Sequence, residues 1–435
     1  MVRVPADEGC KEASEKRYTC YKTLKENIFS DNCVLFERLH IRIPRDLAEG
    51  PDFHPAPDST RSPQSSTIPS HPITSLPFPY TPSVMAFPQI TCAGTPYEIG
   101  HTHGKQASPA IKRCIAFYAS LFQSLAGRTW PQVQQMASTF TPNIQSKWPW
   151  LYEEMKGVAD GAGVEVLDVV ALNCRSEIAL TKFSDGCTSL ACPSTTSGAD
   201  GSTWLAQNWD WKHEQKENMI LLHIHADGKP KISMVTEAGI IGKIGLNSSG
   251  VGVCLNAIRA TNLDPTLPPI HLALRLVLES TSLNNAVKML EKERGVAGFG
   301  HFLIADHTDA KGCEVGPKGV FAVDSEHGWV THTNHLVAIP DTLKDEIDDD
   351  PEWLTDSPVR LTRIRELIKN APAEVGQERI RSMLSDEQNQ PGAICRAGDL
   401  ETVFNIIMEF NKDGSMGWVV EGRPSEGQKA VTFGY

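Results

Sequence analysis

The chain has 435 residues, with 41 lysines and arginines against 53 aspartates and glutamates, giving a formal net charge of −12. Hydrophobic residues make up 40% and charged residues 22% of the sequence, which is ordinary for a globular protein of a size that can bury a large core. The acidic balance argues against a general nucleic-acid binder, because such a protein needs a basic face.

Neither end of the chain carries a recognisable targeting or membrane segment. No apolar run reaches the roughly 18 residues of a membrane-spanning helix, and the N-terminal MVRVPADEGCKEASEK lacks the apolar stretch of a signal peptide. The C-terminal TFGY is not a peroxisomal tripeptide of the Ser-Lys-Leu type. The 11 scattered cysteines include no CxxC pair, which is typical of free thiols in a reducing compartment. We therefore predict a cytoplasmic protein.

The first 84 residues differ in character from the rest. Nine prolines lie between Pro51 and Pro82, interleaved with Ser, Thr and His. Such a stretch has no periodic apolar face whose burial could offset the entropy lost on ordering. We predict a disordered Pro/Ser-rich extension over 1–84, which a start codon assigned too far upstream would also explain, and a globular domain over 85–435.

The globular part begins with helices and continues with strands. From Pro96 to about Leu180 apolar residues recur three and four apart, with Thr95 as the N-cap of the first helix. After Asp185, short β-rich segments separated by SGADG, ADGK and NSSG turns predict strands. Two helices follow, the second capped by Ser282, then more strands, a helix over PVRLTRIRELIKN and two closing strands. This order predicts an α+β fold of layered helices and sheets.

The strongest local signal is SDGCTSL, where helical sequence gives way to the first strand. Gly186 there can adopt backbone angles closed to other residues, so the peptide bond after it can be bent and approached by a thiol. Cys187 opens the strand, which fixes its side chain at the sheet edge. A buried structural thiol is the alternative, since free cysteine is among the most buried residue types.

Six ordered motifs indicate a family. In chain order they are LNCRSE, SDGCTS, AQNWDW, TEAGIIGKIGLNSSGVGV, HTNH and ICRA. Their order and approximate spacing, from ITCAGTPYEIGHTHG to GRPSE, resemble the isopenicillin N acyltransferase family over residues 90–425. These acyl-coenzyme A:6-aminopenicillanic acid acyltransferases are cysteine-type N-terminal-nucleophile hydrolases, so the resemblance implies a four-layer αββα sandwich.

The resemblance also implies self-cleavage and the residues that carry it. Members cut themselves before a cysteine, here between Gly186 and Cys187, which would yield chains 85–186 and 187–435 as a heterodimer. The new α-amino group, with a reference pKa of about 7.7–8, can take the thiol proton at neutral pH. Asp210 matches a position tied to processing and activity, Asn334 the oxyanion-binding amide, and Arg396 an active-site arginine that can pair with a carboxylate or an anionic substrate.

The function we predict is acyl transfer from an amide or acyl-CoA, through an S-acyl enzyme, to an amine or water. It needs no cofactor, although acyl-CoA can serve as co-substrate. The partners we expect are small-molecule substrates and the two halves of the chain itself, without nucleic acid or membrane. Two alternatives stay open. One is hydrolysis of an amide in a non-penicillin metabolite or peptide, which the C-terminus favours because it lacks the penicillin enzyme's peroxisomal address. The other is an uncleaved, non-catalytic binding module.

Other patterns in the sequence give weaker evidence of function. His223, His225, His332 and His335 lack a completing carboxylate or cysteine at a recognisable spacing, so we predict no metal site. The glycines of GIIGKIGLNSSGVG are expected to form turns between strands, and HTHG to lie on a helix surface. Cys192, on the opposite pleat face from Cys187, is expected to have no catalytic role.

Removing residues 1–84 should leave folding, self-cleavage and turnover essentially unchanged, because the proline-rich stretch offers no core and the family resemblance starts only after Met85. Solubility, chain pattern and activity of a protein starting at Met85 check this against the full chain. An insoluble or inactive truncated protein would mean that the extension packs on the domain.

Overall fold

The computed structural model describes residues 87–179, 186–197, 201–260, 262–340, 343, 355–370 and 374–435. The predicted extension over 1–84 therefore lies outside the described residues. So does the segment 180–185, directly before the predicted cleavage site.

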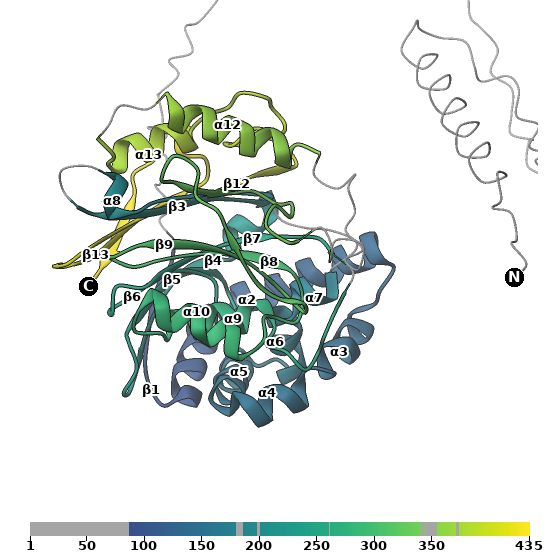
Figure 1. Ribbon diagram of the computed structural model, residues 1–435. Helices are drawn as coiled ribbons and strands as arrows, with labels where there is room; N and C mark the ends of the chain where they lie inside the picture. Colours follow the sequence, from purple (N-terminus) through teal and green to yellow (C-terminus); the bar gives the residue numbers. More distant parts are fainter. Residues whose placement is uncertain are drawn as a thin grey trace, which may run out of the picture. The chain divides into compact units, whose positions relative to one another are not determined.

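Two stacked β-sheets form the middle of the domain (Figure 1). The eight-stranded sheet has, in spatial order, β1 (Gln89–Gly94), β4 (Met219–Ala226), β5 (Ile232–Glu237), β6 (Ile244–Asn247), β7 (Gly252–Ala257), β8 (Gly300–Ala305), β9 (Ala310–Gly316) and β10 (Gly319–Val323). The six-stranded sheet has, in the same way, β11 (Val330–His332), β2 (Gly186–Cys192), β3 (Thr203–Lys212), β12 (Leu400–Asn411), β13 (Gly414–Glu421) and β14 (Val431–Gly434). All pairings are antiparallel except that of β1 with β4, which is parallel.

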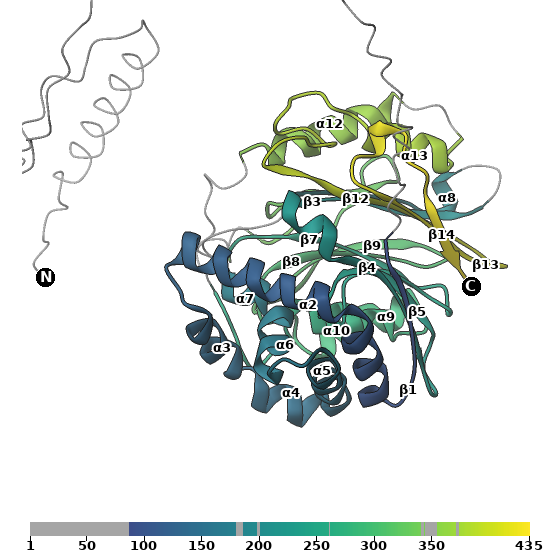
Figure 2. The same ribbon diagram turned by 180° about the vertical axis from the view of Figure 1, so that it is seen from behind.

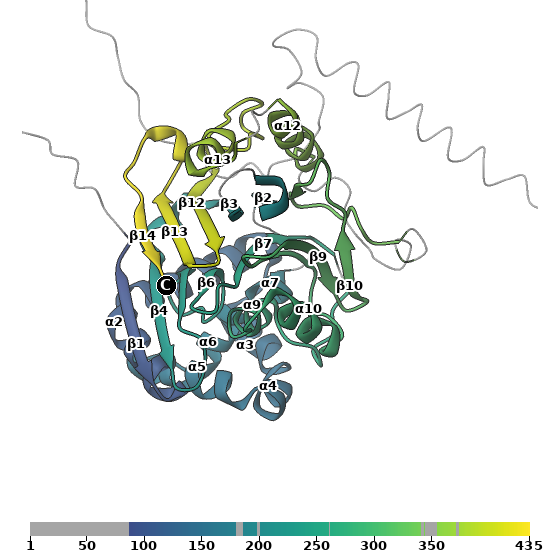
Figure 3. The same cartoon turned by 60° about the vertical axis from the view of Figure 1, so that its left-hand side comes forward.

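Helices cover the outer face of each sheet, which gives four layers (Figure 2). On the eight-stranded side lie α2 (Pro96–Ala126), α3 (Trp130–Ser138), α4 (Thr141–Lys147), α5 (Pro149–Ala162), α6 (Val166–Asn173), α7 (Arg175–Ala179), α9 (Ile270–Leu278) and α10 (Leu283–Lys292). On the six-stranded side lie α12 (Ser357–Lys369) and α13 (Gln377–Leu384), with α12 next to β2 and α13 next to β12 (Figure 3). The predicted αββα sandwich is confirmed.

The two faces of the six-stranded sheet enter different cores. Leu190, Cys192 and Ala206 pack with Ile364 of α12 and Ile380 of α13. The alternate residues of the same strands, among them Cys187, Ala191 and Trp209, belong to the core between the sheets. The period-two alternation of a strand produces this division, and it confirms that Cys187 and Cys192 lie on opposite pleat faces.

Most predicted elements are present. Thr95 caps α2, with Glu98 completing a capping box and Pro96 in the first turn, and Ser282 caps α10. The prediction missed β1, β6, β9, α13 and β14. The glycine-rich GIIGKIGLNSSGVG contains strand β6, so its glycines are not turn residues alone. The prediction for HTHG was wrong at His103, which is fully buried and accepts a hydrogen bond from the Gly239 backbone N–H at 3.1 Å.

Helices α2 and α5 pack in unusually close contact. A Cβ built at Gly100 or Gly104 of α2 would lie 1.9 or 2.1 Å from a backbone oxygen of α5, and one at Gly157 or Gly161 of α5 would lie 2.2 or 2.3 Å from a backbone oxygen of α2. Four glycines thus allow the backbones of the two helices to touch.

Among the described residues, no helix combines the length and apolar character that a membrane span needs.

Gly104→Ala should lower the free energy of unfolding by about 2–3 kcal/mol, because a methyl group against a backbone oxygen forces the two helices apart. Urea unfolding followed by tryptophan fluorescence measures this. Gly376→Ala is the matched control, since a Cβ there meets nothing within 4 Å, and it should change stability by less than about 0.5 kcal/mol. Equal stability of the two variants would contradict the close packing.

Candidate active site

Strand β2 opens on the Gly186–Cys187 junction. Its register with β3 sets Gly186 opposite Asp210 and Cys187 opposite Trp209. Paired residues share a face of the sheet, so Cys187 and Trp209 face the core between the sheets, whereas Gly186 and Asp210 face the α12 side. Cys187 and Asp210 have no solvent exposure.

Gly186 lies where a side chain would have little room. A Cβ built there would lie 3.2 Å from the Oδ2 atom of Asp210 and 3.3 Å from the guanidinium carbon of Arg396. A side chain at position 186 would therefore crowd an ion pair that lies directly against the junction.

A β-bulge in β12 arranges the residues beside Asp210. Thr402 lies opposite Asp210, and Phe404 lies opposite Trp209. Strand β12 therefore has one extra residue between these two pairs, and β3 has none. The Thr402 hydroxyl thereby donates to the Asp210 Oδ1 atom at 2.7 Å. Phe404 lies on the other face, with its ring 5.5 Å from that of Trp209.

Asp210 is a buried carboxylate with a cation beside it. The Nε atom of Arg396 lies 3.0 Å from its Oδ2 atom, but neither atom has a hydrogen-bond partner of acceptable angle, so the contact is an ion pair and not a linear hydrogen bond. Burial raises the pKa of Asp210 to about 6, against the opposing effect of Arg396. The carboxylate is thus mostly ionised at neutral pH.

Asn334 lies on the other side of Cys187. Strand β11 pairs His332 with Ser189, and the same register carried two residues further sets Asn334 opposite Cys187. The Asn334 Oδ1 atom accepts the backbone N–H of Cys187 at 2.8 Å, and its Nδ2 atom donates to the carbonyl of Ala257 at 3.0 Å. The amide is thereby fixed with its oxygen toward the nitrogen of the Gly186–Cys187 bond.

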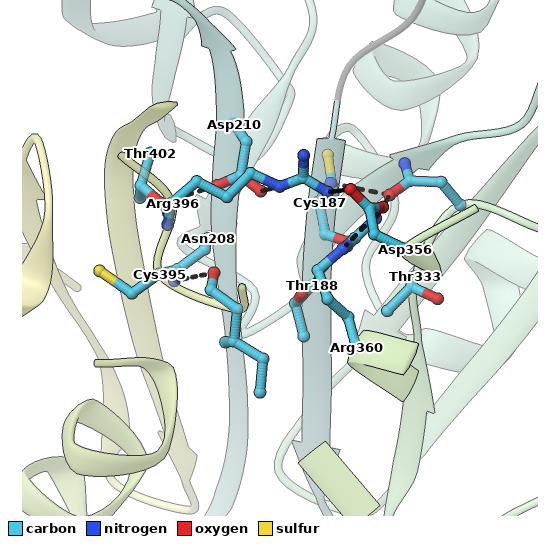
Figure 4. A network of polar contacts seen from close by, with 12 residues as sticks. Cys187, Thr188, Asn208, Asp210, Thr333, Asp356, Arg360, Cys395, Arg396 and Thr402 are labelled. Atoms are coloured by element: carbon cyan, nitrogen blue, oxygen red, sulfur yellow. Dashed lines mark hydrogen bonds and ion pairs between the residues drawn. The ribbon is translucent and has the colours of Figure 1, made fainter. Parts of the chain in front are cut away.

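The structure adds two residues that the sequence analysis missed. Arg360 of α12 donates to the backbone carbonyl of Cys187 and, at 2.9 Å, to the Asn334 Oδ1 atom. Asp356 links Arg360, at 3.3 Å, to Arg396, at 2.6 Å (Figure 4). A signal was present, because Arg360 stands four and eight residues before Ile364 and Ile368, on the buried face of an amphipathic helix.

The four residues predicted from the sequence, Cys187, Asp210, Asn334 and Arg396, therefore lie in one network of polar contacts beside the Gly186–Cys187 bond. Figure 4 shows Cys187, Asp210 and Arg396 within it. In the part of the chain that is described, no group of three or more His, Cys, Asp or Glu is arranged to hold a metal ion.

The four layers, with the inner strand β2 beginning at Gly186, are those of the N-terminal-nucleophile hydrolase fold. The family model described as acyl-coenzyme A:6-aminopenicillanic acid acyl-transferase matches residues 196–422. The acyl-coenzyme A:6-aminopenicillanic-acid-acyltransferase 40 kDa form of Emericella nidulans is 36% identical over 344 residues, which cover 77% of this chain and 93% of that protein. The chain belongs to this acyltransferase family, and it is an enzyme of the acyltransferase type.

A solved structure is also similar, at a greater distance. Penicillin V acylase from Agrobacterium tumefaciens matches with a TM-score of 0.34 and 12% sequence identity, over 54% of this chain and 83% of that one. This likeness is too distant to add to the family assignment.

Thr402→Val should lower the free energy of unfolding at pH 7.5 by about 1–3 kcal/mol, because it removes a hydrogen bond to a buried ionised carboxylate. Without that bond the folded-state pKa of Asp210 rises further above its unfolded value. The loss should therefore grow as pH rises through about 6 and be small at pH 5, where Asp210 is protonated.

Urea unfolding at the two pH values measures this difference, and Thr402→Ser, which keeps the hydroxyl, is the control. A loss of equal size at both pH values would show that the hydroxyl does not act on the ionised form of Asp210.

Proposed function

We propose that this chain cuts itself between Gly186 and Cys187 and that the freed Cys187 is the nucleophile of acyl transfer. The observation that carries the proposal is the hydrogen bond from the Cys187 N–H to Asn334, within a network that also holds the carbonyl of Cys187 and lies directly against Gly186. A buried structural cysteine has no need of such a network.

The cut begins when the Cys187 Sγ atom attacks the carbonyl carbon of Gly186. An S–C bond forms and the C–N bond breaks, while the nitrogen takes up a proton and becomes the α-amine of Cys187. Water then hydrolyses the thioester and leaves Gly186 as a carboxylate. Full burial of Cys187 in the uncut chain supports the view that this form does not turn over external substrate.

In the processed enzyme the nucleophile and its base lie on one residue. The α-amine accepts the thiol proton, and the thiolate attacks the carbonyl of an amide or thioester substrate. The Asn334 amide group donates to the oxyanion that forms, an interaction typically worth a few kcal/mol. Asp210 and Arg396 keep the strand in position and set the charge next to the amine.

Buried ion pairs can hold the two chains together after the cut. Arg175 of the first chain pairs with Glu237 of the second at 2.8 Å, and Glu154 of the first pairs with Arg275 of the second through two hydrogen bonds of 2.7 and 2.8 Å. Separation would leave these charges buried without partners, at a cost of several kcal/mol each. We therefore propose a stable heterodimer of 85–186 and 187–435.

The substrates we propose are an acyl-CoA or a small amide as donor and an amine or water as acceptor. The name of the Emericella nidulans relative supports the first of each pair. Both donors give the same S-acyl Cys187 intermediate, so transfer and hydrolysis differ only in which acceptor reaches the thioester.

Denaturing mass spectrometry of the purified protein should show one chain ending at Gly186 and one spanning 187–435. Cys187→Ala should stay whole and inactive, whereas Cys192→Ala, with its thiol on the other face of the same strand, should cut normally. Incubation of the wild type with an acyl-CoA, followed by acid quenching, should add the mass of the acyl group to the 187–435 chain. An uncut, fully active wild type would refute the proposal.

A further inference from the structure

Arg360 is the most deeply placed cation at the cleavage site, and the proposed chemistry does not yet use it. Its residue exposure is 1%. The Nη1 atom donates to the backbone carbonyl of Cys187 and, at 3.1 Å, to the hydroxyl of Thr188, while the Nη2 atom donates to the Asn334 Oδ1 atom. One rigid guanidinium group thus holds both the backbone of the nucleophile and the amide beside it.

Arg360 and the nitrogen of Cys187 share one acceptor. The Asn334 Oδ1 atom lies 2.8 Å from the Cys187 nitrogen and 2.9 Å from the Arg360 Nη2 atom. After the proposed cut that nitrogen is an amine, which becomes a cation when it takes up a proton. A fixed positive charge at this range opposes protonation, so Arg360 favours the free base.

Asp356 moderates this effect. Its Oδ1 atom lies 3.3 Å from Arg360 and its Oδ2 atom 2.6 Å from Arg396. Its side chain is 24% exposed, whereas those of the two arginines are almost fully buried. The Asp356 carboxylate is therefore the accessible member of the network, and its removal leaves Arg360 and Arg396 without the anion that pairs with both.

Other ionisable groups face Cys187 from the surrounding elements. They are Asp210 of β3, Arg396 before β12, Cys254 of β7, His332 and His335 beside Asn334, and the Lys243–Glu237 pair, whose ammonium group lies 3.5 Å from the centre of the Trp209 ring. Burial lowers the pKa of His335 to about 4, so His335 carries no charge at neutral pH. Asp356 contacts Arg396, and both Arg360 and Asp356 act on the pKa of Asp210, so a substitution at either position also changes the charge around these two residues.

We propose that Arg360 is a positioning residue that orients Asn334. Its positive charge also favours the loss of one proton from the Cys187 thiol–amine pair at neutral pH, and the negative charge of Asp356 limits this effect. This inference rests on the proposed function. The thiol and the amine titrate as a coupled pair, and a nearby cation favours proton loss from either site, so the expected direction does not depend on which site holds the proton.

The test is the pH dependence of kcat/KM in the processed enzyme, with p-nitrophenyl acetate as an acyl donor that releases a coloured product. The acid limb of this profile reports the free enzyme. Arg360→Met should move its midpoint up by about one pH unit, and Asp356→Asn should move it down by a similar amount. Arg360→Lys keeps the charge but not the paired hydrogen bonds, so kcat/KM should fall while the midpoint stays.

The opposite directions separate an electrostatic role from a structural one, because misfolding lowers the rate without moving the midpoint in two directions. If Arg360→Met does not fold or cut, the downward shift in Asp356→Asn still decides the matter. Midpoints within about 0.2 pH units of the wild type would overturn this inference alone. A wild type that stays uncut, or that reacts no faster than Cys187→Ala, would overturn the proposed function instead.

Discussion

The carboxamide oxygen of Asn334 is the atom on which the site depends. It accepts the N–H of Cys187 from β2 and an N–H of Arg360 from α12, while the backbone N–H of Asn334 donates to the Ser357 hydroxyl at the start of α12 at 2.7 Å. Strand β11 ends at His332, so its backbone pairing with β2 does not reach the Gly186–Cys187 junction. A side-chain amide replaces it, and the position of α12 therefore determines the position of the peptide bond.

The two faces of strands β2 and β3 carry different chemical groups. The thiol of Cys187 faces the core between the sheets with Trp209 and Phe404. The ion pairs of Asp210 lie on the other face. The backbone nitrogen of Cys187 lies at the boundary between the two environments. In the proposed processed enzyme this nitrogen is the amine that accepts the thiol proton, so the base and the thiol belong to one residue.

Local sequence predicted the elements whose signals are local. The capping box of Thr95 and Glu98 and the cap at Ser282 each depend on residues within one helical turn. Strand β1 was missed because its parallel partner β4 lies more than one hundred residues away. His103 was misplaced because the loop that covers it, at Gly239, comes from a distant segment.

The candidate site was predictable only in part for the same reason. Its motifs identified Cys187, Asp210, Asn334 and Arg396 through the family resemblance. Asp356 lies in no such motif, and its contacts exist only once the fold has brought α12 and the segment before β12 together. The bulge that turns Thr402 toward Asp210 depends on the pairing of β12 with β3, which β12 sequence alone does not specify.

The network explains how several buried charges can stay beside one peptide bond. Along it the signs alternate, from Asp210 to Arg396 to Asp356 to Arg360, so each charge has opposite neighbours and the group as a whole is neutral. Such pairs are weak sources of stability, because the loss of hydration offsets most of their attraction. They do fix geometry and local potential. The last cation, Arg360, contacts the carbonyl of Cys187 and, through the Asn334 Oδ1 atom, the backbone nitrogen of Cys187, so the network fixes the charge around the residue proposed as the nucleophile.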